Sequence, residues 1–161
     1  MTEHEYDREK AVAYAKRWAF DRNPAYLNFD NLGGDCTNFA SQCLYAGSGI
    51  MNPTKTFGWY YYNSRNRTPS WTGVGYLYNF LISNKGVGPY AIETDPSGVK
   101  PGDIVQLGQS NGHFYHSPVV VAVENGLIYV AAHTDDAYGR PLDSYIYDRA
   151  RFLHIVGVRK W

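Results

Sequence analysis

A pair of adjacent glycines followed directly by a helical pattern constrains this chain more than any other feature. Gly33–Gly34 permits a tight, open backbone turn because neither residue has a side chain. Apolar residues then recur at three- and four-residue spacing through Phe39–Leu44, which predicts one buried helix face. Gly47 is the expected C-terminal stop. Cys36 is therefore placed in the first turn of a short, half-buried helix.

The position of Cys36 allows two interpretations. The unpaired N–H groups and the positive dipole end of a helix N-terminus favour a thiolate and lower a cysteine pKa, which indicates an activated nucleophile. The alternative is a small buried apolar residue that begins a helix. The only other cysteine, Cys43, lies roughly 10 Å further along the helix by its rise, too far for a disulfide. Two thiols are also too few for a zinc site made of cysteine alone.

The length and charge of the chain exclude several classes of function. The 161 residues predict a single domain, 1–161, with a real hydrophobic core. The 15 basic and 15 acidic residues cancel, so neither nucleic acid nor an anionic membrane surface is an expected partner. No apolar run approaches the roughly 20 residues that span a bilayer. The N-terminus lacks a signal segment, so we expect either a cytosolic protein or a sequence whose leader or neighbouring domain lies outside it.

Helical patterns precede strand patterns along the chain. Asp7–Phe20 is an amphipathic helix with Asp7 as its N-cap, and Thr72–Asn84 is a further helix capped at Gly86. The β patterns follow, at Ile104–Leu107, Val119–Val123, Leu127–Ala132 and Phe152–Val158. This order predicts an α+β domain with N-terminal helices packed on an antiparallel β-sheet.

Aromatic residues are abundant, with 15 Tyr and 4 Trp. The segment Phe57–Tyr62 is nearly all aromatic, and Trp71 follows a polar stretch. One interpretation is a wall that contacts a flat polar ligand such as a sugar or peptide, with Trp59, Tyr60 and Trp71 as candidate contacts. The other is that these rings cover the core.

A nucleophilic cysteine needs a base within hydrogen-bond reach and a group that orients the base. Of the five histidines, His116 is the first candidate because it begins the apolar strand at the rim of the sheet. His133 ends the partner strand, across the tight turn Glu124–Gly126. That register makes the two histidines diagonal neighbours, with Cβ atoms roughly 7–8 Å apart. The orienting group is then expected from His133–Asp135.

Other roles for these histidines stay open at this point. His113 is an alternative base, in a turn where it is less fixed. Either His116 or His133 can instead serve as a hydrogen-bonding residue at a strand end. The ligand types of His116, His133 and Asp135 are compatible with a metal, but no HExxH spacing supports a metal site and Cys36 would then be unexplained. We therefore expect no metal and no cofactor.

Together these motifs resemble a known superfamily. They are the Gly-Gly-Asp-Cys-Thr-Asn-Phe block at Gly33–Phe39, Ser41–Gln42, the Pro-Gly-Asp strand entry at Lys100–Asp103, His116, and His133–Thr134. From about Asp7 to Val158 the chain is similar to the NlpC-like and CHAP superfamily, papain-like cysteine peptidases and amidases of bacterial cell walls. Within it, the chain most resembles the group called "Putative amidase domain".

The resemblance implies a papain-like fold with Cys36 as nucleophile, His116 as base and His133 as the third polar residue. It also implies that Tyr26 supports the oxyanion. We expect Asp35 to serve the turn rather than the chemistry, and Asp135 is a further candidate for substrate binding. The implied reaction is hydrolysis of an amide in peptidoglycan or a related peptide through a thioester. The implied location is extracellular, at the cell wall, with other wall-targeting domains if the sequence is a fragment. The alternatives are a non-enzymatic carbohydrate- or peptide-binding module and an acyl transferase on the same site.

Overall fold

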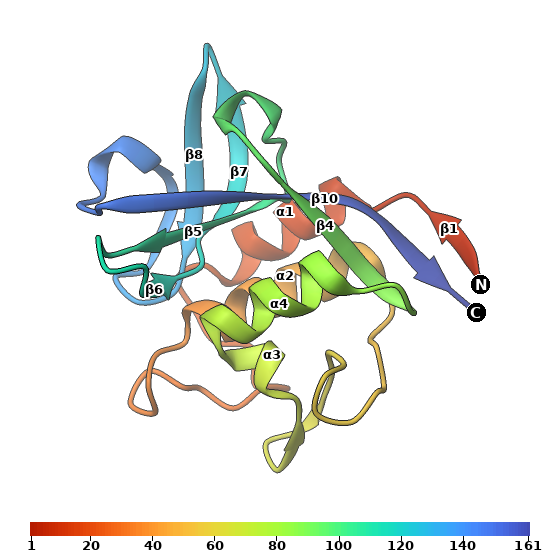
Figure 1. Ribbon diagram of the computed structural model, residues 1–161. Coiled ribbons are helices and arrows are strands. Elements are labelled where there is room, and N and C mark those ends of the chain that lie inside the picture. The colour runs from red at the N-terminus through yellow and green to blue at the C-terminus, as the bar shows by residue number, and fades with distance from the viewer.

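Four helices lie against one face of a curled antiparallel sheet, as Figure 1 shows. The computed structural model describes residues 1–161. The helices are α1 (Arg8–Trp18), α2 (Cys36–Ser48), α3 (Pro69–Thr72) and α4 (Val74–Ser83). None of them is long and apolar enough to cross a membrane. The α+β prediction is confirmed.

The sheet has eight strands, in the order β1-β10-β5-β7-β8-β9, with β4 also paired to β10 and β6 to β5. Their bounds are β1 (Thr2–His4), β4 (Gly88–Thr94), β5 (Ile104–Gly108), β6 (Phe114–His116), β7 (Val119–Glu124), β8 (Leu127–Ala132), β9 (Ala137–Pro141) and β10 (Arg149–Lys160). A separate small hairpin joins β2 (Tyr61–Asn63) and β3 (Asn66–Arg67). Short 3₁₀ turns cover Pro96–Gly98 and Leu142–Ser144. The two termini lie side by side because β1 pairs with the end of β10 (Figure 1).

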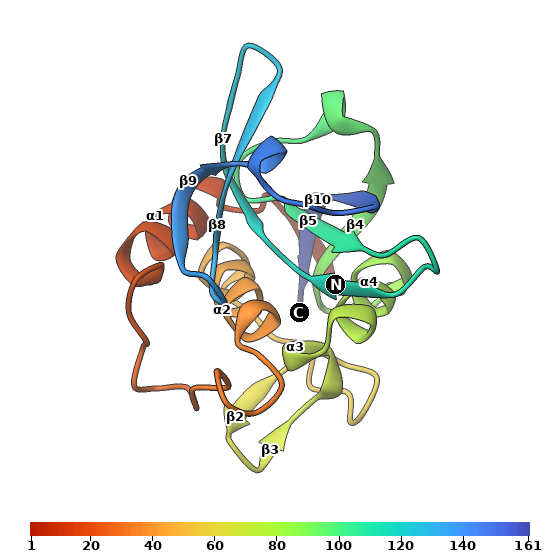
Figure 2. The same ribbon diagram turned by 90° about the vertical axis from the view of Figure 1, so that its left-hand side faces the viewer.

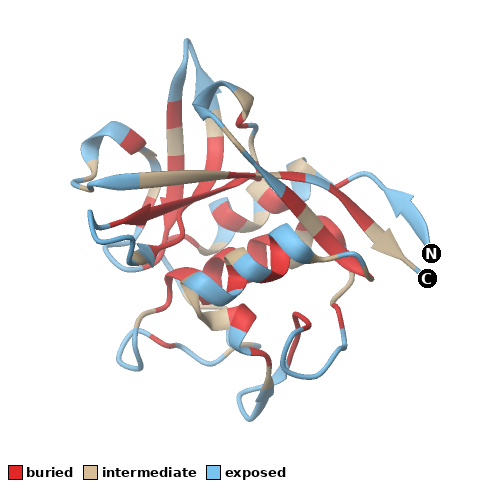
Figure 3. Ribbon diagram, in the orientation of Figure 1, coloured by how far each residue is buried: buried red, intermediate tan, exposed pale blue.

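Helix α2 is the centre of the core, and Figure 3 shows it buried along most of its length. Its neighbour α1 begins as predicted, because the Asp7 carboxylate accepts a hydrogen bond from the Lys10 N–H at 3.0 Å. The predicted stop at Gly47 is wrong. Gly47 lies inside α2, where its missing side chain lets the ring of Tyr6 approach closely. The helix ends instead at Gly49, whose φ of 71° is the left-handed conformation that favours glycine.

Two other predicted elements, a helix and a strand, differ in their boundaries. The helix expected over Thr72–Asn84 is α4, which begins two residues later than predicted because the extended backbone of Gly73 separates it from the preceding α3. Helix α4 ends at Ser83 with Asn84 as its C-cap, so Gly86 is not the cap. Strand β10 is longer than the predicted Phe152–Val158, because it pairs with β1, β4 and β5 in turn.

The β7–β8 hairpin rises beyond the helices in Figure 2. It starts in the predicted register, with Glu124 opposite Leu127 and Val123 opposite Ile128. A bulge between Val120 and Ala122 then shifts the pairing by one residue. His116 is not part of β7, as was expected, but ends the separate strand β6, where it lies opposite Leu107 of β5. The two histidines are therefore not placed by the hairpin alone.

The Pro-Gly-Asp entry to β5 has a structural explanation. The carboxylate of Asp103 is fully buried and accepts hydrogen bonds from Arg8 at 2.8 Å and from the Ile155 N–H at 2.9 Å. It also accepts from the Lys100 N–H at 2.8 Å and lies 2.9 Å from Nδ1 of His154. One carboxylate thus joins α1, β5 and β10, and His154 has the structural role of a strand residue.

Candidate functional site

The thiol of Cys36 lies at the start of α2, against strand β6. Its Sγ is 3.9 Å from the carbonyl oxygen of Tyr115 and 3.7 Å from Oγ1 of Thr37. The backbone N–H of Ser117 also donates toward the sulfur. The thiol is therefore held by residues on both sides of His116, with 8% of the Cys36 side chain exposed.

Burial raises the pKa of the Cys36 thiol above its ordinary value. The hydroxyl of Thr37 and the backbone N–H groups of Ser117 and Thr37 oppose this shift without cancelling it. The expectation that the helix start lowers this pKa is therefore not met, because desolvation of the thiolate outweighs the N–H groups. The resting group at neutral pH is the thiol.

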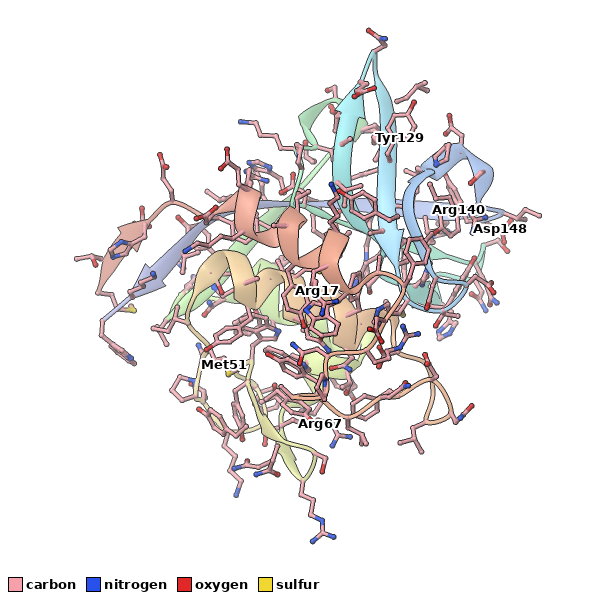
Figure 4. The ribbon with its side chains drawn as sticks, turned by 180° about the vertical axis from the view of Figure 1, so that it is seen from behind. Arg17, Met51, Arg67, Tyr129, Arg140 and Asp148 are labelled. Carbon is pink, nitrogen blue, oxygen red and sulfur yellow. The ribbon has the colours of Figure 1, made fainter.

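The imidazole of His116 forms no hydrogen bond in the structure and is 7% exposed. Its ring centroid lies 5.7 Å from that of Tyr145, whose buried hydroxyl also lacks a hydrogen-bond partner. Burial lowers the pKa of His116 to about 4; the Arg140 charge adds to this shift and Asp135 opposes it. Arg140, labelled in Figure 4, covers the ring of Tyr145. At neutral pH His116 is therefore an uncharged base with both ring nitrogens available.

The depressed pKa of His116 predicts a pH-dependent stability. The unfolded chain binds a proton below about pH 6.5, whereas the folded chain does so only near pH 4. The free energy of unfolding should therefore fall as the pH drops through this window, by about 3 kcal/mol for this one group. Urea unfolding of wild type and His116→Asn at several pH values measures the difference. Parallel pH profiles for the two proteins would show that the fold does not favour the neutral ring.

His133 lies beneath the start of α2, and its side-chain hydrogen bonds are made to residues other than His116. Its Nδ1 is 2.5 Å from a carboxylate oxygen of Asp35, and its Nε2 is 2.8 Å from the carbonyl oxygen of Trp18. The ring stacks on Phe39, with centroids 4.0 Å apart. Because both ring nitrogens are engaged, His133 makes no hydrogen bond to His116.

Asp35 ties the segment before α2 to the loop after β8. Its other oxygen accepts hydrogen bonds at 2.9 Å from the Phe29 N–H and from the Asn38 side chain. Burial alone would raise the pKa of Asp35, but hydrogen bonds from His133, Asn38 and Phe29 hold it below its ordinary value. Arg22 lies 3.6 Å away and also forms ion pairs with Asp30 and Asp136. These contacts join Asp35 to Phe29, Asn38 and His133, and support of the turn stays its predicted role.

The loop that follows His133 has an unusual backbone. Thr134 and Asp135 have φ values of 68° and 52°, which non-glycine residues rarely adopt and which cost of order 1–3 kcal/mol each. A Cβ added to Gly34 would lie 3.7 Å from Oγ1 of Thr134. Gly33–Gly34 itself has positive φ at both residues, as its sequence predicts. The strained loop and the glycine turn before Cys36 thus lie together.

The aromatic residues expected to contact a ligand belong to the core. Trp59 and Trp71 are fully buried, with ring centroids 4.8 Å apart, and Tyr60 is 7% exposed. The alternative interpretation, that these rings cover the core, therefore describes them. Tyr26 stacks on Trp71 at 5.9 Å and makes no hydrogen bond to Cys36. This burial removes Trp59, Tyr60 and Trp71 as ligand contacts, whereas Phe57 and Tyr62 of the same segment are exposed.

Two further features of the site bear on the other sequence predictions. His116, His133 and Asp135 do not come together as a group that could hold a metal ion. A groove of about 700 Å³, which sequence reasoning missed, reaches Gly33 and Tyr115, the residue whose carbonyl oxygen contacts the Cys36 thiol. Its lining residues are Gly33, Thr72–Tyr76, Tyr78, Asn79, Gly112–Tyr115 and Arg151. They come from four distant segments, so no local pattern predicts the groove.

Comparison with known proteins gives one family and two relatives. The family described as "Putative amidase domain" matches residues 5–156. "Uncharacterized protein YhbB" of Bacillus subtilis (strain 168) is 37% identical over 163 residues, covering 94% of this chain and 51% of YhbB. "Uncharacterized protein YjcM" of the same organism is 26% identical over 144 residues, covering 84% of this chain and 32% of YjcM. The chain thus spans about half the length of YhbB and about a third of YjcM. No solved structure matches.

Proposed function

Because the chain belongs to the family described as "Putative amidase domain", we propose that it is a cysteine-dependent amidase or peptidase. Its substrate is an amide bond in bacterial peptidoglycan or a related peptide, and its fold is the papain-like arrangement of the NlpC-like and CHAP superfamily. The contact between Cys36 and strand β6 carries the proposal. The thiol lies 3.9 Å from the carbonyl oxygen of Tyr115, and His116 is the next residue of that strand.

The first step starts from a neutral pair rather than a preformed thiolate. Because burial keeps Cys36 protonated and His116 uncharged, the imidazole takes the thiol proton as Sγ bonds to the substrate carbonyl carbon. The carbonyl electron pair moves onto oxygen. The free N–H groups of the first turn of α2, that of Cys36 among them, face the charge that develops there.

The second half of the reaction returns each group to its starting state. The tetrahedral intermediate expels the amine, which takes its proton from the His116 imidazolium, and a thioester remains on Cys36. Water then attacks the thioester and gives a proton to His116. The thiolate leaves, the acid product dissociates, and Cys36 recovers its proton.

Asp135 is the group that supports the His116 imidazolium in this mechanism. Its negative charge raises the pKa of His116 against the effect of burial. His133, the third polar residue implied by the resemblance, acts instead through Asp35, which it fixes below the start of α2. His133 is thus a positioning residue for Cys36.

Product analysis tests the proposal directly. Purified peptidoglycan is incubated with the protein, and the soluble fragments are identified by mass spectrometry. We expect one type of amide to be cut, with the mass of one water added and a new amine and carboxylate at the ends. Adding an amine acceptor separates hydrolysis from acyl transfer, because a transferase would yield the amine adduct instead. Protein alkylated with iodoacetamide should release no fragments. A second incubation uses soluble peptides derived from the cell wall as the substrate. If the protein that has not been alkylated leaves both the peptidoglycan and these peptides unchanged, the proposal is refuted.

A further inference from the structure

The groove that reaches Tyr115, the residue whose carbonyl oxygen contacts the Cys36 thiol, contains a cation with no direct ion-pair partner. The groove measures about 700 Å³ and is bounded by Gly33 on the nucleophile side and by Arg151 of β10. Arg151 forms no ion pair, and no Asp or Glu lines the groove. Burial lowers the pKa of the Arg151 guanidinium, and the charges of Tyr78 and Glu93 oppose the shift. Glu93, which is bonded by the hydroxyl of Tyr78, compensates this charge only through space, so Arg151 keeps hydrogen-bond donors that a ligand can bind.

The guanidinium of Arg151 is held between two aromatic rings. Its central carbon lies 3.6 Å from the ring centroid of Tyr78 and 3.9 Å from that of Phe114. Nε donates to Oε1 of Gln106 at 2.8 Å, whereas the two terminal nitrogens have no partner. Because both faces of the plane are covered, only the edge that carries these donors is open. That edge matches a planar acceptor with two oxygens, which binds through two parallel hydrogen bonds.

A chain of buried hydrogen bonds connects Arg151 to the residue after the nucleophile. Gln106 is fully buried, and its Nε2 donates to Oγ of Ser117 at 3.2 Å. The hydroxyls of Ser117 and Thr37 are 3.1 Å apart. Gln106 also donates to the carbonyl oxygen of Val74, in the first turn of α4, at 2.9 Å. Arg151, the start of α4 and the start of α2 therefore share one fixed frame, in which an anchored ligand group would have a constant position relative to Cys36.

The opposite wall of the groove also suits an anion. It is the start of α4, which lies beside β6 in Figure 1 and has no side-chain cap. A Cβ added to Gly75 would meet no atom within 4 Å, so the first turn of the helix is open. The N-terminal end of a helix adds a partial positive charge to the one on Arg151.

From this arrangement we propose that the groove is a carboxylate-binding subsite, and that Arg151 selects peptides with a free carboxylate near the amide to be cut. The inference rests on the proposed function, since it assumes that Cys36 acts on a peptide in the same groove. Arg151 touches the substrate but not the reacting atoms, so it determines specificity. Aligning the substrate carboxylate fixes the scissile carbonyl over the thiol.

Binding to an inactive variant tests the subsite without relying on catalysis. The probes are synthetic N-acetylated tetrapeptides with Glu or Gln at each position in turn, each made with a free and an amidated C-terminus. In the Cys36→Ala background, at least one carboxylate peptide should bind about tenfold more tightly than its amide counterpart, as expected for charge-assisted hydrogen bonds. Arg151→Gln should remove this preference. Arg151→Lys should lose most of this preference, because a lysine ammonium keeps the positive charge but lacks the two parallel N–H donors of the guanidinium.

Arg159→Gln is the matched control. Arg159 lies on the same strand and stacks on Tyr90 at 3.7 Å, but it is outside the groove. This variant should keep the carboxylate preference. Urea unfolding verifies each fold, and Arg151→Lys decides the result if Arg151→Gln does not fold. The subsite is refuted if no peptide pair differs in affinity or if the preference survives both Arg151 variants.

Wall hydrolysis by the wild-type protein, measured in parallel, separates the two proposals. Hydrolysis without a carboxylate preference would overturn the subsite alone. A carboxylate preference without hydrolysis would overturn the amidase proposal and leave the groove as a carboxylate-binding site that does not select a bond for cleavage.

Discussion

Replacing Cys36 with alanine will reduce amide hydrolysis by at least about a thousandfold, because no other group in the site can form the thioester. The neighbouring hydroxyl of Thr37 is hydrogen-bonded to Ser117 and is 1% exposed, so it cannot take over the role. The rate of peptidoglycan hydrolysis and the capture of a thioester by hydroxylamine are the two measurements. Both signals should disappear in Cys36→Ala.

Cys43→Ala provides the matched control, because it removes the only other thiol. Cys43 is fully buried in the core, and burial raises its pKa well above the ordinary value. Its loss leaves a small cavity and should cost about 1 kcal/mol of stability while activity is kept. Full hydrolysis by Cys36→Ala, or equal loss in both variants, would contradict a nucleophilic role for Cys36.

The local elements of this fold could be predicted because each is set by residues close in sequence. The bounds of β8 are those predicted, since the tight turn at Asn125–Gly126 fixes the start of the strand. The start of α2 at Cys36 follows from the glycine turn in the same way. Gly47 misled the prediction, because a glycine that ends a helix and one that admits a neighbouring ring have the same sequence signature.

The site could be predicted only in part because its decisive contacts are long-range. The helix start makes Cys36 a candidate, but the contact of its thiol with Tyr115 joins residues 79 apart. The hydrogen bond between Asp35 and His133 spans 98 residues, so hairpin geometry could not reveal that this imidazole turns away from His116. For the same reason Arg151 was not a candidate. Its partner Gln106 is 45 residues away, and neither residue belongs to a motif.

Replacing Asp35 with alanine should produce the largest loss of stability at the site, about 3–5 kcal/mol, because it leaves buried partners unpaired. The carboxylate is 1% exposed and bonds to His133, Asn38 and the Phe29 N–H. Hydrolysis should also fall in the protein that remains folded, since this carboxylate fixes the segment that carries Cys36. Urea unfolding at neutral pH measures the first effect, and activity below the unfolding transition measures the second.

Asp30→Ala is the control for that loss, and pH gives a second test. Asp30 bonds the same Arg22 but is exposed, so its removal should cost less than about 1 kcal/mol of stability.

The folded pKa of Asp35 lies below its ordinary 3.8. Its contribution should therefore be complete above that pH and shrink as the pH falls toward the folded value. The gap in unfolding free energy between wild type and Asp35→Ala should narrow accordingly in acid. A constant gap, or equal losses in the Asp35 and Asp30 variants, would mean that the buried carboxylate does not anchor the start of α2.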